Sequence, residues 1–218
     1  ALKEYVARMP PEQSEIYFMA GESREAVAHS PHLEALRQRN YEVLFFLDPI
    51  DEWILTGLSE YDGKSLKSID CGDLKLGTEE EKKKAETEQE AARKELQDLL
   101  AFVRERLKDE VKDVRVSRRL TDSPCCLVAD EGGMNAHMER LMRAMNQNVP
   151  HDARILEINP KHPVLQRMKA LFDQDREAPL LKDFVELLHG QALLTEGSPL
   201  KDPVRFTGLV NRLMVSAS

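Results

Sequence analysis

The side chains with the most distinctive chemistry in this sequence are the methionines of the segment Gly132–Gln147. Apolar residues recur there at intervals of three and four, which is the spacing of one face of an α-helix. Methionine is unbranched and polarizable, so a face made of it adapts to irregular apolar surfaces and accepts varied partners. The face consists of Met134, Met138, Leu141, Met142 and Met145. The chemistry indicated by this pattern is adaptable apolar contact.

This stripe has two interpretations. An amphipathic helix normally buries its apolar face in the core of its own domain, and the pattern taken alone favours that interpretation. The alternative is an exposed binding surface. In both cases Glu139, Arg140 and Arg143 point away from the stripe, because they fall on the opposite side of the helical wheel.

No motif for catalysis occurs in the sequence. Neither a phosphate-binding glycine loop nor a G-x-S-x-G nucleophile turn is present. The six histidines are scattered, and His29 and His32 are separated by Ser30-Pro31. Cys125 and Cys126 are adjacent and lack the C-x-x-C spacing of zinc sites. We therefore predict no catalytic residue, no metal site and no cofactor within this chain, and we expect the cysteines to be reduced and buried.

Composition narrows the class of protein further. A chain of 218 residues with 41% hydrophobic and 32% charged residues is long enough for two globular domains. A net charge of −8 argues against nucleic acid as the main partner, and no apolar run is long enough for a membrane span. The sequence opens without Met or a signal peptide, so we expect a piece of a longer, cytoplasmic protein.

The first 77 residues have the pattern of a small α/β unit. Apolar runs at Glu15–Met19 and Val43–Leu47 predict two buried strands, and the helical pieces between them predict that the strands are parallel. Ser65–Ile69 predicts a further edge strand. Asp48 should cap a helix that leaves Trp53 partly exposed. The predicted core face of that helix is Ile50, Ile54, Leu58 and Tyr61.

A Glu- and Lys-rich run between Gly77 and Lys94 marks a boundary and predicts a solvated helix. A second unit follows, in which a long helix leads to three strands. The predicted strands are Val114–Ser117, Cys125–Ala129 and Arg154–Ile158, the first two joined across a turn. The predicted fold class is therefore mixed, with a small α/β subdomain followed by an α+β domain that ends in a helical bundle.

The last two predicted helices, Leu180–Leu194 and Asp202–Met214, have apolar arcs wider than one neighbouring surface requires. Two such helices are half of a four-helix bundle that a second copy of the chain can complete about a twofold axis. A bundle closed within one chain is the alternative. The predicted dimer contacts are Leu181, Phe184, Leu187, Leu188, Leu194, Phe206, Leu209, Val210 and Leu213.

Several segments together resemble the ninety-kilodalton heat-shock chaperones, the heat shock protein 90 family. The resemblance covers essentially the whole chain, and the segments occur in the family's order. They are LKEYVARM at Leu2–Met9, IYFMAGES at Ile16–Ser23, SPHLEAL at Ser30–Leu36, YEVLFFLDPIDEW at Tyr41–Trp53, LTDSPCCLV at Leu120–Val128, MERLMRA at Met138–Ala144, LEINPKHP at Leu156–Pro163 and ALLTEG at Ala192–Gly197.

The resemblance implies that residues 1–77 are the C-terminal α/β part of a middle domain and residues 78–218 a C-terminal dimerisation domain. The family's ATP- and magnesium-binding domain and its catalytic arginine have no counterpart here. The sequence also ends without the acidic Met-Glu-Glu-Val-Asp tail of cytosolic eukaryotic members, so it looks like the bacterial high-temperature protein G type.

The resemblance further implies a homodimer that binds unfolded or partly folded clients, and it shifts the interpretation of the methionine stripe from core to binding surface. The implied client residues are Glu52, Trp53, Met134, Met138, Leu141 and Met142. The alternative is an oligomerisation or regulatory module of a larger enzyme that has no client-binding role.

Overall fold

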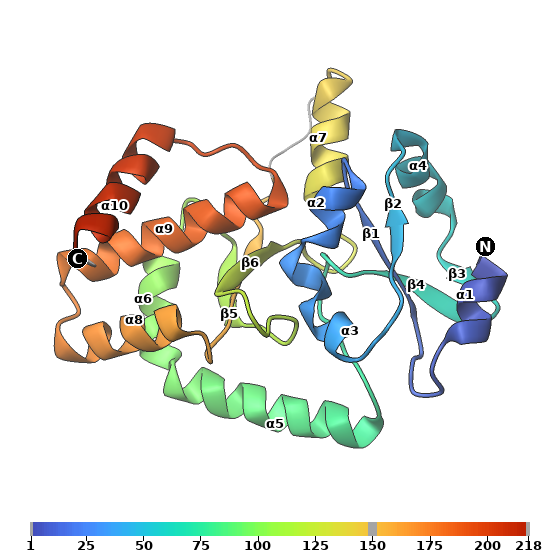
Figure 1. Ribbon diagram of the computed structural model, residues 1–218, viewed down its shortest axis with the longest axis horizontal. Helices are drawn as coiled ribbons and strands as arrows, with labels where there is room; N and C mark the ends of the chain where they lie inside the picture. The colour runs from blue at the N-terminus through green and yellow to red at the C-terminus, as the bar shows by residue number, and fades with distance from the viewer. Residues whose placement is uncertain (1, 148–151, 217–218) are drawn as a thin grey trace.

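The chain folds around two small β-sheets, each with its own helices (Figure 1). The structure is a computed structural model that describes residues 2–147 and 152–216, without the side chains of Glu52, Thr56 and Ser216. We call residues 2–77 the first unit and residues 78–216 the second unit. This mixed architecture confirms the predicted fold class. No helix in the described ranges is long and apolar enough to cross a membrane.

The sheet of the first unit has the strand order β2-β1-β4-β3. Strand β1 is almost wholly buried and pairs in parallel with both β2 and β4. The predicted parallel strand pair is confirmed, and so is a strand near Ser65–Ile69, which is β4. Its predicted place at the edge is wrong, because the short strand β3 pairs antiparallel with β4 and takes the edge. The strands are β1 Ile16–Ala20, β2 Leu44–Phe46, β3 Glu60–Tyr61 and β4 Lys64–Ser68.

Short helices complete the first unit. Ser23 caps α2 by accepting a hydrogen bond from the Ala26 N–H at 3.2 Å, and Pro49 opens α4 as the sequence predicted. Tyr17, Leu36 and Ile69 form the centre of the unit's core. The helices are α1 Leu2–Arg8, α2 Arg24–Ala28, the 3-10 helix η1 Pro31–Leu33, α3 Glu34–Gln38 and α4 Pro49–Gly57.

The sheet of the second unit has the order β5-β7-β6. The strands are β5 Asp113–Val116, β6 Cys125–Val128 and β7 Ile155–Ile158. All three predicted strands are present, but β5 and β6 do not pair with each other. Strand β7 enters between them, parallel to β5 and antiparallel to β6. Both β6 and β7 are buried along their whole length, so this sheet is the centre of the second unit.

Helices enclose the second sheet and extend beyond it. A core of apolar residues from α6, α8, α9 and the three strands fills the interior, whereas α5 has no buried residue and is the solvated helix that the sequence predicted. Helix α10 packs on α9, where a Cβ on Gly190 would come within 2.6 Å of the Phe206 ring. The helices are α5 Glu79–Glu95, α6 Gln97–Arg106, α7 Ala136–Ala144, α8 Pro163–Gln174, α9 Pro179–Glu196 and α10 Pro203–Ser216.

Backbone hydrogen bonds join the two units. The Ala129 N–H donates to the Asp70 carbonyl at 3.0 Å, and the Gly72 N–H donates to the Ala129 carbonyl at 2.8 Å. A second link comes from Glu34 at the start of α3, whose carboxylate accepts the N–H groups of the loop at residues 121–123 at distances from 2.6 Å. Burial raises the pKa of Glu34, but these hydrogen bonds outweigh it and leave the pKa below its usual value.

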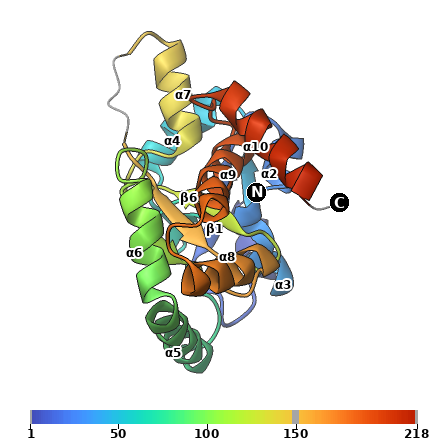
Figure 2. The ribbon, with the colours of Figure 1, turned by 90° about the vertical axis from the view of Figure 1, so that its left-hand side faces the viewer.

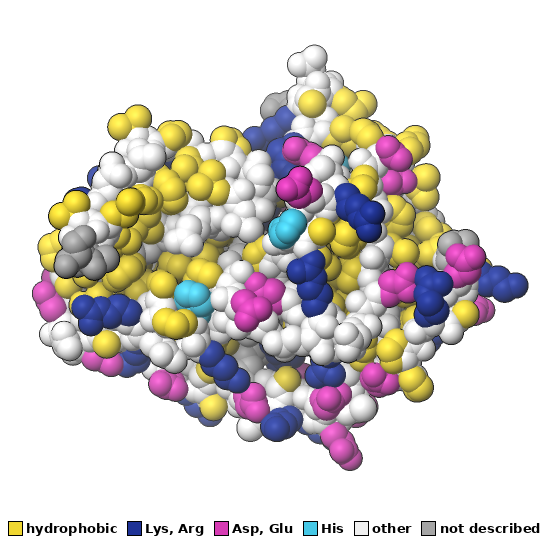
Figure 3. Space-filling view, viewed as in Figure 1, with side chains coloured by type: hydrophobic (Ala, Val, Ile, Leu, Met, Phe, Trp, Pro, Cys, Tyr) yellow, Lys and Arg dark blue, Asp and Glu magenta, His cyan; other side chains and the backbone are white. Residues whose placement is uncertain are grey.

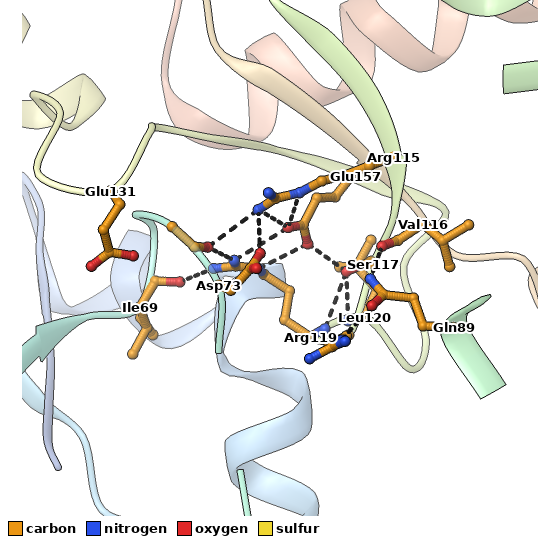
Figure 4. A network of polar contacts seen from close by, with 12 residues as sticks. Ile69, Asp73, Gln89, Arg115, Val116, Ser117, Arg119, Leu120, Glu131 and Glu157 are labelled. Atoms are coloured by element: carbon orange, nitrogen blue, oxygen red, sulfur yellow. Dashed lines mark hydrogen bonds and ion pairs between the residues drawn. The ribbon is translucent and has the colours of Figure 1, made fainter. Parts of the chain in front are cut away.

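A buried ion pair lies at the same junction (Figure 4). Arg119 Nε is 2.9 Å from Glu157 Oε2, and both residues are at most 2% exposed. The Arg119 guanidinium also donates to the carbonyls of Ile69 and Gly72 in the first unit. Glu157 accepts further bonds from Arg115 at 2.8 Å and from the Ser117 hydroxyl at 2.6 Å. Arg119 therefore binds a carboxylate of its own unit and two backbone carbonyls of the first unit.

Replacing Arg119 with Met should destabilise the fold by about 3–5 kcal/mol, because Glu157 would keep its charge in the interior with fewer partners. Urea denaturation followed by circular dichroism measures the loss. The control is Arg93→Met: the Arg93 side chain is 73% exposed and 3.9 Å from Glu90, so its loss should cost about 1 kcal/mol or less. Equal losses in the two variants would contradict the structural role of the buried pair.

Candidate functional site

The predicted methionine helix is present as α7, and it is shorter than its sequence pattern. It spans nine residues from Ala136 to Ala144. Asn135 caps it by accepting a hydrogen bond from the Met138 N–H at 2.7 Å. Met134 lies before the first turn and Met145 is the C-cap residue, so both flank the helix. Both views show α7 projecting from the body of the molecule (Figures 1 and 2).

One charged residue of α7 is more buried than the apolar face of the helix. Its only buried residue is Glu139, which is 6% exposed, whereas Met138, Leu141 and Met142 are half-buried. The Glu139 carboxylate lies 2.6 Å from Arg154 Nη2. The helix is thus anchored by a charged side chain, and its methionine face does not belong to the apolar core clusters of the described structure.

Met134 and Met138 line a groove of about 490 Å³ between the two units. Leu55 of α4, Phe18 of β1 and Leu66 of β4 also line it, together with the charged Lys67 and Glu131. The groove is therefore built from α4, the first sheet and the entrance to α7. Yellow side chains gather over α4 and α7 in the space-filling view (Figure 3).

Helix α4 contradicts one prediction and confirms another. Ile50 and Ile54 were expected in the core, but they are 61% and 50% exposed. The helix follows β2 at the edge of the sheet, and no layer of the described structure covers that side. Trp53 is 43% exposed, which confirms that this tryptophan is only partly buried. The side chain of Glu52 lies outside the described residues. Ile50, Trp53 and Ile54 together extend the apolar surface beyond the groove.

The cysteines and acidic groups show no arrangement for catalysis. Cys71, Cys125 and Cys126 are free and buried, as predicted, and burial raises the pKa of Cys125 to about 12. Among the residues that the structure describes, no cluster of three His, Cys, Asp or Glu side chains could hold a metal ion.

Comparison with known proteins agrees with this geometry. The family described as "Hsp90 protein" matches residues 1–218. The chain belongs to the Hsp90 family. It is 59% identical over 216 residues to the protein named "Chaperone protein HtpG" of Geobacter sulfurreducens, and 49% identical over 224 residues to the protein of the same name in Myxococcus xanthus. These alignments cover 99% and 100% of the chain but only 33% and 34% of the relatives, so the chain spans about a third of their length.

The predicted dimer residues of this Hsp90 chain divide into two groups. Leu181, Leu187, Leu188 and Leu209 are at most 3% exposed, because the chain's own helices cover them. These four residues could contact a second copy only if the helices that bury them moved away. The other five are half-buried or exposed and remain partly accessible. They are Phe184, Leu194, Phe206, Val210 and Leu213.

The exposure of α4 predicts a difference between two isoleucines. Ile54→Ala should change the free energy of unfolding by about 0.5 kcal/mol or less, because the side chain is half in water. Ile69→Ala should cost about 2–5 kcal/mol, because Ile69 is 0% exposed and its truncation leaves a cavity. Urea unfolding measures both. A comparable loss for Ile54→Ala would show that α4 packs its isoleucines inward.

Proposed function

We propose that this chain is the client-binding and dimerising segment of a cytoplasmic Hsp90 chaperone. Residues 1–77 would form the end of the middle domain and residues 78–218 the C-terminal dimerisation domain. The observation that carries the proposal is that α7 buries Glu139 while its methionine face stays partly exposed and outside the apolar core clusters of the described structure. The relatives named "Chaperone protein HtpG" support the same class of function.

The groove has the properties that an unfolded client requires. Unfolded chains offer apolar segments of varied shape, so their binding surface needs flexible side chains and few specific hydrogen bonds. Met134 and Met138 supply flexible contacts in the groove. Trp53 does not line the groove, but it is part-exposed on α4 and offers a large rigid contact there. Ile50 and Ile54 widen this surface. We therefore add these two residues to the proposed client surface, alongside Glu52, Leu141 and Met142.

Dimerisation is proposed through the outer side of α9 and α10. Figure 3 shows yellow side chains over both helices. Val204, Met214 and Val215 on α10 are 82%, 66% and 78% exposed, which is unusual for large apolar residues of a single surface. Pairing with a second copy about a twofold axis would cover exposed apolar side chains of this helix. The partly accessible residues are the proposed contacts.

The alternative function is an oligomerisation or regulatory module with no client role. Under that alternative α10 still pairs, but the α7 face meets a fixed surface of the same protein. In both cases we expect no ATP hydrolysis by this chain, and ATP and magnesium would be bound elsewhere in the full-length family. Client binding by the α7 face separates the two functions.

Met138→Ser/Met142→Ser should weaken binding of a permanently unfolded model protein by about tenfold, because apolar contacts at a binding centre contribute roughly 1–2 kcal/mol. Fluorescence anisotropy with reduced, carboxymethylated lactalbumin measures the affinity, and thermal unfolding checks the fold. Ile50→Ser/Ile54→Ser should also weaken binding.

The matched control for client binding is Met9→Ser, which alters a half-buried methionine of the first unit away from the groove. Its affinity should equal that of the unmodified chain. If the α7 variant keeps full affinity while the chain still dimerises, the module alternative is favoured. A loss of affinity explained by unfolding would return the methionine stripe to a structural role.

Val210→Asp/Leu213→Asp should convert a dimer into a folded monomer, because two charges at the interface would be buried without partners at a cost of several kcal/mol. Sedimentation velocity at tens of micromolar measures the state of association. Ala85→Asp/Ala91→Asp, on the solvated helix α5, is the control and should remain dimeric. A monomeric unmodified chain at these concentrations would refute the proposal. Leu188→Asp is a poor test, because Leu188 belongs to the chain's own core.

A further inference from the structure

The polar side of α7 is connected to the end of α9 through a buried row of charges. Glu139 on α7 lies 2.6 Å from Arg154, which precedes β7, and Arg154 Nε lies 3.4 Å from Glu196 Oε2. All three side chains are at most 8% exposed. Arg143 approaches Glu139 from the outside at 2.6 Å. Glu196 is the last residue of α9, so this row joins α7 to the final turn of α9.

Arg140 makes a second connection between the same two places. Its Nη1 donates to the Glu196 carbonyl at 3.0 Å, and its Nε donates to Glu22 in the first unit at 2.9 Å. The guanidinium also covers Gly197, the left-handed C-cap of α9 with φ +82. A Cβ on Gly197 would lie 3.4 Å from Arg140 Nη2. Glycine is favoured here because of the left-handed backbone angle.

These contacts hold α7 in place more than apolar packing does. A helix of nine residues is marginal in water by itself, and the apolar face of α7 is only half-buried. A buried ion pair adds little net stability, but its loss leaves a charge without a partner. Such a pair therefore specifies where a helix sits. In α7 the position of the methionine face depends on Glu139 and Arg140.

We infer that Glu139 and Arg140 are positioning residues that couple the methionine face of α7 to the last turn of α9. Six residues after that turn α10 begins at Pro203, so a rearrangement of α10 reaches α7 through Glu196 and Gly197. The groove wall formed by Met134 and Met138 then moves with the end of α9. This inference rests on the proposed function only in assigning that wall to clients; the coupling itself is a property of the fold.

The test is a double-mutant cycle read by hydrogen exchange with mass spectrometry on the whole chain. Gly197→Ala strains the C-cap of α9, because its φ is +82, and so disturbs the Glu196 carbonyl that Arg140 binds. It should raise the exchange rate of α7 amides by about tenfold while exchange in β7 stays unchanged. The matched control is Gly208→Ala in α10, where a new Cβ meets nothing within 4 Å. That variant should leave α7 unchanged.

The second arm repeats Gly197→Ala in an Arg140→Met background. Arg140→Met alone should raise α7 exchange, and Gly197→Ala should then add no further increase in α7, because the link is already broken. Coupling between two sites is reciprocal. Glu139→Gln, which keeps the side-chain size, should therefore raise exchange in the last turn of α9, at residues 193–197. This variant also replaces Gly197→Ala as the perturbation if that protein does not fold.

Two results would overturn the coupling: α7 exchange unaffected by Gly197→Ala, or an effect of equal size with and without Arg140. The proposed function fails separately. If α7 responds as described but Met138→Ser/Met142→Ser binds the unfolded protein at full affinity, the coupling stands and the client assignment falls. If the methionine variant loses affinity but α7 does not respond to Gly197→Ala, the client surface stands and the coupling falls.

Discussion

The relative position of the two sheets depends on the buried ion pair of Arg119 and Glu157. Neither charge is tolerable alone in the interior, so the pair forms as a unit or the region does not fold. Arg119 also binds the carbonyls of Ile69 and Gly72, which gives the pair its full set of partners only when the two units are docked. The groove takes its lining from both units, so its shape depends on how the two units are docked.

The residues that form the large apolar core and the exposed apolar residues of α4 and α7 lie in different elements of this fold. The large core of the second unit lies among α6, α8, α9 and the sheet, whereas α4 and α7 leave Ile50, Ile54 and Met145 at least 50% exposed. Each Å² of apolar surface left in water lacks the roughly 25 cal/mol of stabilising free energy that its burial would give. Large exposed apolar patches generally mark interaction surfaces. Because these helices contribute little to the core, the cost is local and the fold tolerates it.

The sequence predicted where helices and strands occur along the chain better than it predicted which elements pack against each other. Local signals decide where α4 begins, since Asp48 and Pro49 are cap residues whatever surrounds them. The same helix shows the limit, because a helical wheel identifies an apolar side without showing whether a sheet lies beside it. For Ile50 and Ile54 none does. Strand β7 was predicted as a strand, but its position between β5 and β6 depends on long-range pairing, which local residue spacing does not reveal.

Polar contacts between residues far apart in the chain could not be predicted from the sequence either. Arg119 and Glu157 are 38 positions apart, and Glu34 lies 87 positions before the first amide that it accepts. With 39 acidic residues in the chain, no spacing distinguishes such carboxylates from solvated ones. The methionine stripe was predictable from residue type and helical spacing, and the partial exposure of Trp53 from its place on the helical wheel. The buried role of Glu139 was not, since its place on the wheel indicated solvent.

The burial of Glu139 bears on what can vary in α7 and what cannot. An apolar face that packs in a core is constrained in shape by every neighbour, so a change of one methylene is felt. The α7 face lacks that constraint, because the helix is held from its polar side by Arg154 and Arg140. Its methionines can therefore suit binding without loss of core packing, whereas Glu139 cannot change without stranding Arg154. Separating anchor from contact surface in this way lets one short helix be firmly placed and chemically adaptable.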